Sequence, residues 1–582
     1  MAIKSIKTPH AAVMVWNYVD RIGTEGMTDN LFSSGVDKLV ETEPTIISTL
    51  SLISIQTSKS KGQPDGQFQL TLAPYKNWTS TLTTGSWCVI MMSNEPITKA
   101  DFAKANKNQV KMIGKIETVR VDTQQVDGPS GPERQTRYYV TGTDWGHVFN
   151  SILYVDNLLA SPGDPVSQGN SAAVALRNAL FGKGGTPKSF NVDDNLNSIM
   201  QIFGQSLSGF TAPGSDINRL AKAIYTFKIP KAMVDFFDFR DANNKSVKAD
   251  NISKLLTLKS GVLKGPDQYK ASNEAKGFIN PFSLQGSNSF WQILLENSNP
   301  ALNEMFSEMR WDQGSTNGLN LTIYNRIKPF SFKSFTGEAG SQSGLKSYFQ
   351  WVRLHDLDNN AVRSINAGTN WRDKYNFIEI KPDFQDFTIF ANWYKQKSQA
   401  FDAKSFEREG FRPLILGTRQ FPSAGSKPGQ DNKVNVDWDQ LQVWVRAMRE
   451  WYFNTHRMLN GTLVMQGSTE YIGVGDNIRF DAGLINPTPN INDATVKKGK
   501  NQSIIAHVES ITHNFALNGD ARTYTTTIQF VRGIIVDGNN VIAGRGTLDK
   551  FTTSVSSKSD KNTVNTVSTS SDADPDVKIK GK

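Results

Sequence analysis

The sequence predicts a β-rich α+β fold in which two strand-rich blocks are separated by helical segments. Apolar residues recur at every second position within residues 45–160 and again after residue 460, which is the period of a β-strand. Between the blocks and just after Asn435 the apolar residues recur instead at helical spacing. Gly-, Pro- and Asn-rich stretches punctuate both patterns and mark the turns.

Length and composition limit the classes of protein to which the chain can belong. Its 582 residues suggest several domains, at roughly 100–200 residues each. The net charge of +9 comes from 64 basic and 55 acidic residues, and no block of Lys and Arg marks a dedicated nucleic-acid binder. The single cysteine, Cys88, excludes an internal disulfide and cysteine-based zinc or iron–sulfur sites. Within the apolar run Trp87–Met92 we expect it to be a small buried hydrophobe.

Targeting signals are not apparent in the sequence. Lys4 and Lys7 precede no apolar segment of signal-peptide length before Tyr18. No run approaches the roughly 20 apolar residues that a membrane span requires. We therefore expect a soluble chain without a membrane span, made in the cytoplasm.

Residues 1–44 form an N-terminal arm for which two interpretations stay open. Ala11–Val19 is apolar, but Gly23, Gly26 and Gly35 follow it. The stretch is as well suited to a core element as to an arm lying on another subunit.

Residues 45–160 are predicted to form the first β domain. Leu52, Ile53 and Ile55 indicate a strand with a bulge where the alternation slips. Five or more short strands at this spacing are typical of an antiparallel barrel or sandwich. The other strands are expected around Phe68–Leu72, Trp87–Met92, Val110–Met112, Ile116–Val121 and Tyr138–Val140, with polar turns at Lys61–Gly66 and Asp127–Pro132 and a closing helix at Trp145–Val155.

The middle of the chain combines helical and strand patterns. Residues 161–275 comprise a Pro/Gly/Ser/Asn-rich insertion at 161–188, followed by helical patterns at Asp194–Phe203 and Ile217–Phe227. Residues 276–434 start with a helix capped near Ser289 and continue as an α+β domain. Later features of that domain are a strand at Leu319–Ile323, an elaborated loop at Thr336–Ala367, a strand at Ile378–Phe390 and a charged turn at Phe406–Pro413.

Residues 435–548 are predicted to be a helix packed on a second barrel. Asn460-Gly461 ends the helix, and the sheet continues through Leu463 and Met465 to two long strands at Ile504–Ile511 and Ala521–Val531, joined by a hairpin at Asn514–Asp520. Residues 549–582 form a polar tail that is too poor in hydrophobics to order itself. The apolar face of the helix is made by Trp438, Leu441, Trp444, Val445, Met448, Trp451 and Tyr452.

Candidate chemistry is sparse, and we predict no catalytic, cofactor-binding or metal site. His507 and His513 would meet across a hairpin, but Glu509 is the only nearby third ligand, which favours ordinary barrel histidines over a metal. Gly182–Gly185 lacks the spacing and the Lys-Ser/Thr ending of a phosphate loop. No Gly-x-Ser-x-Gly elbow or His-Glu-x-x-His helix is present.

Two further patterns have a structural and a functional interpretation. The carboxylate pairs Asp193–Asp194 and Asp241 with Asp250 are unremarkable among 55 acidic residues, and no separate domain is apparent to hold a glycosidase cleft. The stripe Trp438, Trp444 and Trp451 would suit stacking on sugars or bases, but its helical spacing favours core packing or contact with a neighbouring subunit.

Eight passages, taken in chain order, carry a resemblance to a known family. They are Tyr138–Trp145, Phe290–Leu295, Asn299–Glu304, Leu321–Phe330, Gly410–Leu414, Asn460–Asp476, His507–His513 and Thr523–Gly533. Together they resemble the central hub proteins of tailed-bacteriophage baseplates, a family that includes late control protein D and the hub half of type VI secretion spikes. The match covers roughly 45–545, whereas both termini and the insertions at 161–188 and 336–367 depart from the pattern.

The resemblance implies two tube-like antiparallel β-barrel domains in each chain and a homotrimer. Three such chains would join a sixfold tail tube to a threefold spike, because a sixfold partner needs six similar surfaces. The implied partners are a trimeric tail spike, a tail-tube or tube-initiator protein, baseplate wedge proteins and a tape-measure protein, with DNA passing through without sequence-specific binding. The implied location is the tail baseplate of a virion assembled in the host cytoplasm. A hub of a bacterial contractile injection device and a hub with peptidoglycan-degrading activity remain alternatives.

Overall fold

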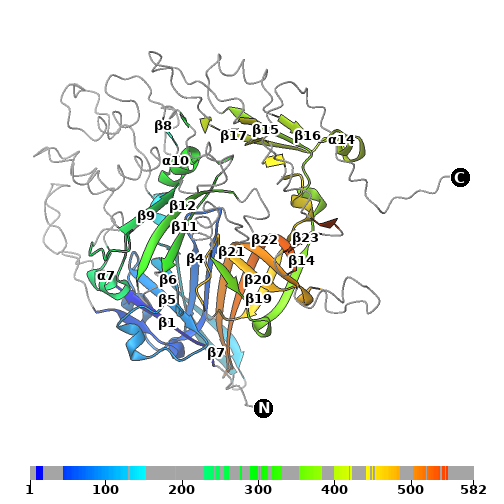
Figure 1. Cartoon of the computed structure of the whole chain (residues 1–582). Coiled ribbons are helices and arrows are strands. Elements are labelled where there is room, and N and C mark those ends of the chain that lie inside the picture. Colours follow the sequence, from blue (N-terminus) through cyan, green and yellow to red (C-terminus); the bar gives the residue numbers. More distant parts are fainter. Residues whose placement is uncertain are drawn as a thin grey trace, which may run out of the picture.

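A fifteen-stranded sheet dominates the computed structural model of the chain (Figure 1). Its main path runs in the order β14-β19-β22-β21-β3-β4-β7-β6-β5-β1-β2, with β13, β20, β23 and β24 attached beside it. The β-rich α+β fold class is therefore confirmed. The structure describes residues 8–17, 43–128, 131–151, 190–191, 229–241, 243–249, 255–260, 276–277, 289–298, 300–301, 303–311, 318–328, 353–382, 399–418, 420–421, 441–442, 444–445, 448–449, 452–468, 470–485, 502–519, 521–537, 540–543 and 546–547.

Strands from both predicted β domains contribute to this one sheet. The predicted arm supplies β1 (His10–Trp16). The first domain supplies β2 (Thr45–Ile47), β3 (Leu52–Ser60), β4 (Gln67–Leu72), β5 (Trp87–Ser93), β6 (Val110–Gly128) and β7 (Gly131–Asp144). The later strands are β13 (Leu354–Asp356), β14 (Val362–Gly368), β19 (Leu459–Gln466), β20 (Asn477–Asp481), β21 (Gln502–Asn518), β22 (Ala521–Asp537), β23 (Asn540–Ala543) and β24 (Gly546–Thr547).

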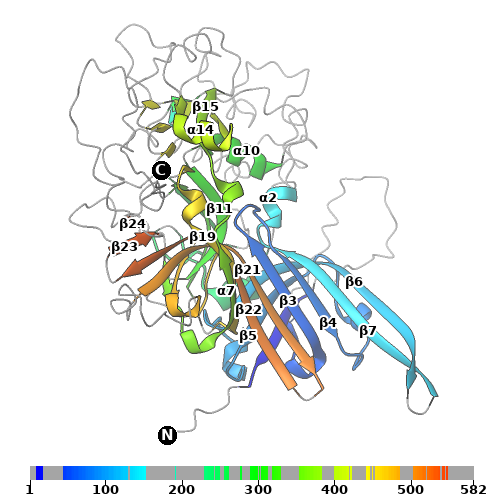
Figure 2. The same ribbon diagram turned by 90° about the vertical axis from the view of Figure 1, so that its right-hand side faces the viewer.

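The two blocks are joined by antiparallel pairing of β3 with β21. The register runs from Ser510 opposite Ser60 to Ala516 opposite Ser54. In Figure 2 the β21–β22 hairpin lies beside β3 and β4, which are followed by β7 and β6. Ladder hydrogen bonds therefore run from one block into the other.

The two blocks repeat one strand topology. In the first module, β3 to β7, the pairing order is β3-β4-β7-β6-β5. In the second module, β14 and β19 to β22, it is β14-β19-β22-β21, with β20 on the other edge of β21. Taking each module's five strands in chain order, the first pairs with the second, the second with the fifth, the fifth with the fourth and the fourth with the third. The two look-alike β modules predicted for one chain are therefore present.

Local geometry repeats along with the topology. Gly85 and Gly475 both have positive φ, at 83° and 80°, a conformation that favours glycine. Gly85 N donates to Ile116 O at 2.7 Å, and Gly475 N donates to Val508 O at 2.9 Å. The return bonds are Ile116 N to Ser86 O at 2.9 Å and Val508 N to Asp476 O at 2.8 Å.

Matching bulges fix how the two modules align. The register shifts between Leu52 and Ser54 in β3 and between Val362 and Ser364 in β14. It also shifts between residues 116 and 118 in β6 and between 508 and 510 in β21. The sequence at the second pair of bulges is similar, Ile-Glu-Thr-Val at 116–119 and Val-Glu-Ser-Ile at 508–511.

The first module carries one additional strand. In the second module β13 pairs directly with β20 in parallel, from Leu354 opposite Asn477. In the first, β1 lies between β2 and β5 and is antiparallel to both. Residues Ala11 to Trp16 are buried, so the core element is the alternative that the structure shows for this part of the arm.

Each module has its own apolar core. Alternating side chains of β3 and β4, among them Ile55 and Leu70, pack with Phe515 and Tyr524 of the other module. The second core contains Leu463, Ile478 and Ile528. A third cluster lies on the outer side of β1 and β5 and includes Trp87 and Trp444. Burial of alternate residues on two long hairpins explains the period of two that the sequence shows.

Smaller elements surround the main sheet (Figure 1). Three small sheets have the orders β18-β10-β8, β11-β12-β9 and β16-β15-β17. Their strands are β8 (Phe190–Asn191), β9 (Leu256–Ser260), β10 (Lys276–Gly277), β11 (Asn303–Trp311), β12 (Leu319–Ile327), β15 (Phe377–Pro382), β16 (Gln399–Phe401), β17 (Pro413–Thr418) and β18 (Gln420–Phe421). The α-helices are α1 (Trp78–Thr81), α2 (His147–Ser151), α7 (Lys231–Phe237), α10 (Phe290–Asn297) and α14 (Ala403–Glu409).

Most predicted strands are present, and some local predictions were wrong. Ser289 caps α10, its hydroxyl accepting from Gln292 N at 3.2 Å, as predicted. The loop predicted at 336–367 contains β13 and most of β14, and the charged turn predicted at 406–413 includes the end of α14. Residues 116–121 continue β6 without a break. The turns predicted at 127–132 and 514–520 are shorter, because both hairpins extend almost to their tips.

Several predictions fall outside the described residues. These are the insertion at 161–188, the helices at 194–203 and 217–227, the end of the helix predicted at 145–155, the strand continuation at 383–390 and the tail at 549–582. The domain boundaries stay predictions. Within the described part of the chain, no helix combines the length and apolarity needed to cross a membrane.

The equivalent glycines allow a matched test of stability. We expect Gly475→Ala to be destabilising by about 2–4 kcal/mol, since strain at positive φ adds to a clash with the Phe306 ring. Gly85→Ala should cost only about 1–2 kcal/mol of strain, because the nearest atom to its Cβ is Lys115 Cε at 3.9 Å. Urea unfolding of both variants measures the difference, and equal losses would contradict this account.

Candidate functional site

Strand β11 passes between the two modules as a fully buried strand that carries charges. All nine residues of Asn303–Trp311 are buried. Glu304, Glu308 and Arg310 are at most 6 % exposed, which is unusual for charged side chains unless they are paired. Each of them contacts a module, so this strand is the natural centre of a candidate site.

Glu304 is the first of these pairing centres. Its carboxylate accepts from Arg326 Nε at 2.8 Å and from Lys61 Nζ at 3.1 Å. Arg532 of β22 lies 3.5 Å away. Burial alone would raise the pKa of Glu304, but the positive charges of Lys61 and Arg326 outweigh it and hold that pKa well below its usual value. Lys61 follows β3 and Arg532 belongs to β22, so Glu304 contacts both modules.

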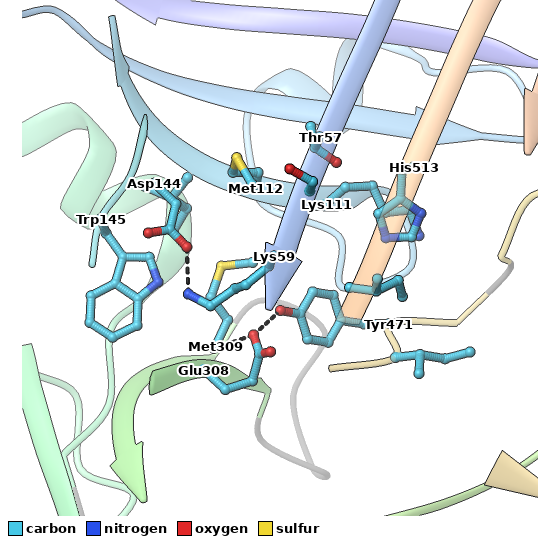
Figure 3. Close-up of a pocket in the computed structure, with 14 residues that line it drawn as sticks. Thr57, Lys59, Lys111, Met112, Asp144, Trp145, Glu308, Met309, Tyr471 and His513 are labelled. Carbon is cyan, nitrogen blue, oxygen red and sulfur yellow. Dashed lines mark hydrogen bonds and ion pairs between the residues drawn. The ribbon is translucent and has the colours of Figure 1, made fainter. Parts of the chain in front are cut away.

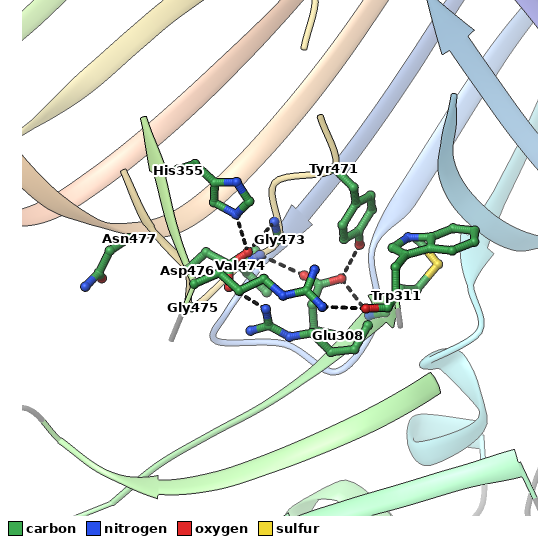
Figure 4. Close-up of polar contacts among 12 residues, drawn as sticks. Glu308, Trp311, His355, Tyr471, Gly473, Val474, Gly475, Asp476 and Asn477 are labelled. Carbon is green, nitrogen blue, oxygen red and sulfur yellow. Dashed lines mark hydrogen bonds and ion pairs between the residues drawn. The ribbon is translucent and has the colours of Figure 1, made fainter. Parts of the chain in front are cut away.

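Asp476, beside the positive-φ Gly475, is the second centre (Figure 4). It pairs with Arg310 NH1 at 2.7 Å and with His355 Nε2 at 3.0 Å, and it accepts from Gly473 N at 3.0 Å. Burial by itself would raise the pKa of Asp476, but Arg310 and His355 lower it. This centre fixes the turn before β20 to both β11 and β13.

Glu308 is the third centre (Figure 4). Its carboxylate accepts from Val474 N at 2.7 Å, from Met309 N at 2.8 Å and from the Tyr471 hydroxyl. Burial raises its pKa in spite of the nearby Lys59. The adjoining Ser307 donates its hydroxyl to Pro64 O of the first module at 2.6 Å.

A small pocket lies where these centres meet the first module (Figure 3). Lys59 pairs there with Asp144, and His513 faces it from β21. Lys111 donates to Asn108 O at 2.9 Å and to Ser468 O at 3.3 Å, and its burial lowers its pKa to about 7. These contacts hold parts of the fold together, which is a structural role.

On five strands of the joined sheet, the face opposite the cores carries no charged side chain, and we call this part the uncharged face. Along β3, β4, β19, β21 and β22, alternate residues point away from the cores and are almost all Ser, Thr, Asn or Gln. Side chains on this face bond to one another, for example Ser54 to Thr71 at 2.9 Å and Ser510 to Gln529 at 2.7 Å. The set is Ser54, Gln56, Ser58, Ser60, Gln67, Gln69, Thr71, Thr462, Gln466, Ser510, Thr512, Asn514, Thr523, Thr525, Thr527 and Gln529, with Val464 and Ala516 as its apolar members.

The predicted histidine group is not brought together as a metal site. His507 Nδ1 bonds Asn477 Oδ1 at 3.0 Å, His513 Nδ1 bonds Thr526 Oγ1 at 3.0 Å, and Glu509 pairs with Lys61 at 3.0 Å. Both histidines lie on β21 itself, so they do not face each other across the hairpin. No cluster of three His, Cys, Asp or Glu side chains suited to a metal occurs in the described ranges.

Other candidates were placed as follows. Trp444 is fully buried with Leu441 and Met448, which confirms core packing at that position. Asp241 accepts from Asn243 N and Lys245 N at 2.8 Å and closes a turn. Cys88 is buried and free. The remaining candidates, Gly182–Gly185, Asp193, Asp194, Asp250, Trp438 and Trp451, lie outside the described residues.

Sequence reasoning missed the role of the charged centres. Glu304, Arg326 and Asp476 stand in the passages that resemble baseplate hubs, but nothing in their spacing assigns a partner. The alternation in Asn303–Trp311 places Glu304, Glu308 and Arg310 on one face of a strand, which is also the pattern of a solvated face, so the sequence does not mark them as buried.

No protein-family model matches the chain, and no curated protein matches it. Solved structures do match. The tail protein from Neisseria meningitidis MC58 has a TM-score of 0.41 at 9% identity, covering 90% of this chain and 96% of its own. The 43 kDa tail protein of prophage MuSo2 from Shewanella oneidensis has a TM-score of 0.39 at 11% identity, covering 90% and 98%. A structure of the Francisella PdpA–VgrG complex has a TM-score of 0.36 at 7% identity, and the match covers 91% of this chain and 53% of the matched chain.

Two buried glutamates on β11 provide a test of the charged junction. Glu304→Gln should destabilise the chain by about 3–5 kcal/mol, because it removes the counter-charge of the fully buried Arg326 and leaves Lys61 paired with Glu509 alone. Glu308→Gln should cost about 1–2 kcal/mol, since an amide oxygen still accepts from Val474 N. Chemical denaturation compares them, and a milder effect at Glu304 would contradict the assignment.

The pH dependence of stability follows from His355. Burial lowers its pKa, but hydrogen bonds to Asp476 and Glu470 outweigh this and raise it to about 9. Because the unfolded pKa is about 6.5, the stabilisation is complete below that pH and is lost as the pH rises through about 9. The difference in unfolding free energy between the native chain and His355→Gln, measured from pH 6 to 10, should therefore shrink as the pH rises. Taking the difference removes the opposite contribution of Lys111, whose lowered pKa makes stability rise with pH. An unchanged slope in the variant would refute the coupling.

Proposed function

We propose that the chain is the structural central hub of a bacteriophage tail baseplate, acting as a homotrimer. In this role it adapts a threefold spike to a sixfold tail tube and forms part of the channel for DNA. The observation that carries the proposal is the internal repeat. Two modules of one chain share a strand order, two pairs of bulges and the hydrogen bonds at Gly85 and Gly475.

The symmetry argument is geometric. A ring of three chains with two equivalent modules each presents six similar units to a sixfold partner. It remains threefold in its other parts, among them the extra strand β1 and the segments between the modules. A threefold partner such as a spike can therefore bind on those parts.

The charged junction suits this role because the angle between the modules must be constant. Glu304, Glu308 and Asp476 are all buried and tie β11 to both modules. Removing one partner from such a pair is costly, so the junction resists rearrangement. A rigid pair of modules keeps the six units of the ring evenly placed.

The uncharged face suits a channel wall. Hydroxyl and amide side chains offer hydrogen bonds without a fixed charge, so they neither hold nor repel a phosphate backbone strongly. DNA would then pass without being retained and without sequence-specific binding. Tail-tube, wedge and tape-measure proteins are the other partners proposed for this virion component, which is assembled in the host cytoplasm and acts without catalysis.

The mass and symmetry of the purified assembly test the proposal. We expect native mass spectrometry to give three copies, and electron microscopy to show rings with threefold symmetry and six similar lobes. Both measurements are repeated with an added spike protein, in case the ring of three chains closes only on its spike. A closed dimer, tetramer or hexamer both without and with the spike protein would overturn the proposal. Release of soluble fragments from purified peptidoglycan by the chain would also overturn it.

A further inference from the structure

The two equivalent strands β21 and β6 differ in how much of one edge is paired. On β21, residues 503–507 pair with β20, and residues 510–516 on the same side, past the bulge, pair with β3. On the equivalent strand β6, residues 110–115 pair with β5. Beyond the bulge, β6 pairs with β7 on its other edge, and no described strand pairs with the edge that corresponds to the β3 position.

The strand equivalent to β3 is also at an edge. β3 pairs with β4 on one side and with β21 on the other. Its counterpart β14 pairs with β19 on one side, and no described strand pairs with the other. The chain thus has one edge of each kind, a β3-like edge on β14 and a β21-like edge on β6.

We infer that β14 of one copy of this chain pairs with β6 of a second copy, as β3 pairs with β21 within the chain. The inference rests on the proposed function, because it requires copies to assemble. The matched bulges set the register: Asn366 takes the place of Gln56, and Asp122 takes the place of Asn514. The predicted antiparallel pairs are therefore Asn366 with Asp122 and Ala367 with Val121.

The side chains agree with that register. Val121 is 53% exposed, whereas its counterpart His513 is 4% exposed within the junction of the two modules. The inferred pairing places Val121 opposite Ala367, on the face of β14 that points into the second core. Asn366 and Asp122 then lie on the same side of the sheet as Gln56 and Asn514.

A second copy is the required occupant, because the two edges do not meet within one chain. In the sheet β14 and β6 are separated by β19, β22, β21, β3, β4 and β7. Unpaired edges bind strands of matching direction and register readily. Within the chain, β3 is the strand that pairs with the edge of β21 equivalent to this edge of β6. In the described part of the repeat the counterpart of β3 is β14, so β14 is the strand that fits the β6 edge.

Engineered disulfides test the pairing and its register. Cys88 is the only native cysteine and is buried, so Asn366→Cys/Asp122→Cys introduces the only accessible thiols. Oxidation with diamide should give covalently linked trimers on a non-reducing gel. Side chains opposite each other in antiparallel strands lie about 4.5–5.5 Å apart at Cβ, close to disulfide geometry.

Two control variants make the outcome decisive. Gln56→Cys/Asn514→Cys should form the equivalent bond within one chain. Asn366→Cys/Val121→Cys is out of phase by one residue, which puts the thiols on opposite faces, and should not crosslink. Equal crosslinking of the in-phase and out-of-phase pairs would overturn the register.

The remaining outcomes separate this inference from the proposed function. Trimers that form without the 366–122 crosslink, while the 56–514 control closes, would overturn the pairing and leave the hub proposal standing. Crosslinked assemblies of another symmetry would support the pairing and overturn the hub proposal. A chain that stays monomeric with and without a spike would overturn both.

Discussion

The pairing of β3 with β21 is the interaction on which the rest of the structure depends. It converts two modules into one sheet, and every other contact between them presupposes its register. Backbone hydrogen bonds alone define a ladder but allow slippage where both strand faces are polar. Here one face carries Ile55 and Phe515 into a core, so a slip by one residue would move both into solvent.

The buried charges add a constraint that the ladder lacks. Hydrogen bonds between strands fix spacing and register, whereas twist between modules is soft. Lys61, at the end of β3, pairs with both Glu304 and Glu509, and Glu304 also faces Arg326 and Arg532. Since a buried charge separated from its partner costs several kcal/mol, twisting the modules apart is penalised beside the end of the ladder, where Lys61 N also donates to Glu509 O at 2.8 Å. Rigidity, rather than net stability, is what such a cluster contributes.

How far the sequence predicts this structure depends on how each residue is buried. Phe68, Leu70 and Leu72 alternate because one face of β4 is in a core, and the strand was predicted from that pattern. Strand β14 was missed because none of its side chains is fully buried and a bulge interrupts the alternation. Its position at the edge of the sheet removes the signal that marks central strands.

The charged centres were unpredictable for a different reason. Charged residues are usually exposed, so a sequence in which Glu304 and Arg310 are interleaved with Met305 and Phe306 has no local feature that identifies their partners. Those partners come from residues 61, 476 and 532, far away in the chain. The internal repeat was equally hard to detect, because it preserves bulges and glycine conformation while keeping few residue identities beyond the stretches at 116–119 and 508–511.

The repeat also explains why assembly would be self-limiting. An unpaired edge is an aggregation hazard in general, and this chain has two of them in the described part of the sheet. Because one edge is β3-like and the other β21-like, the inferred pairing would add copies head to tail, and growth would stop only when the last β14 reaches the first β6. The fixed angle between modules decides how many copies that takes. In the proposed ring, the charged junction inside each chain would therefore set the number of chains.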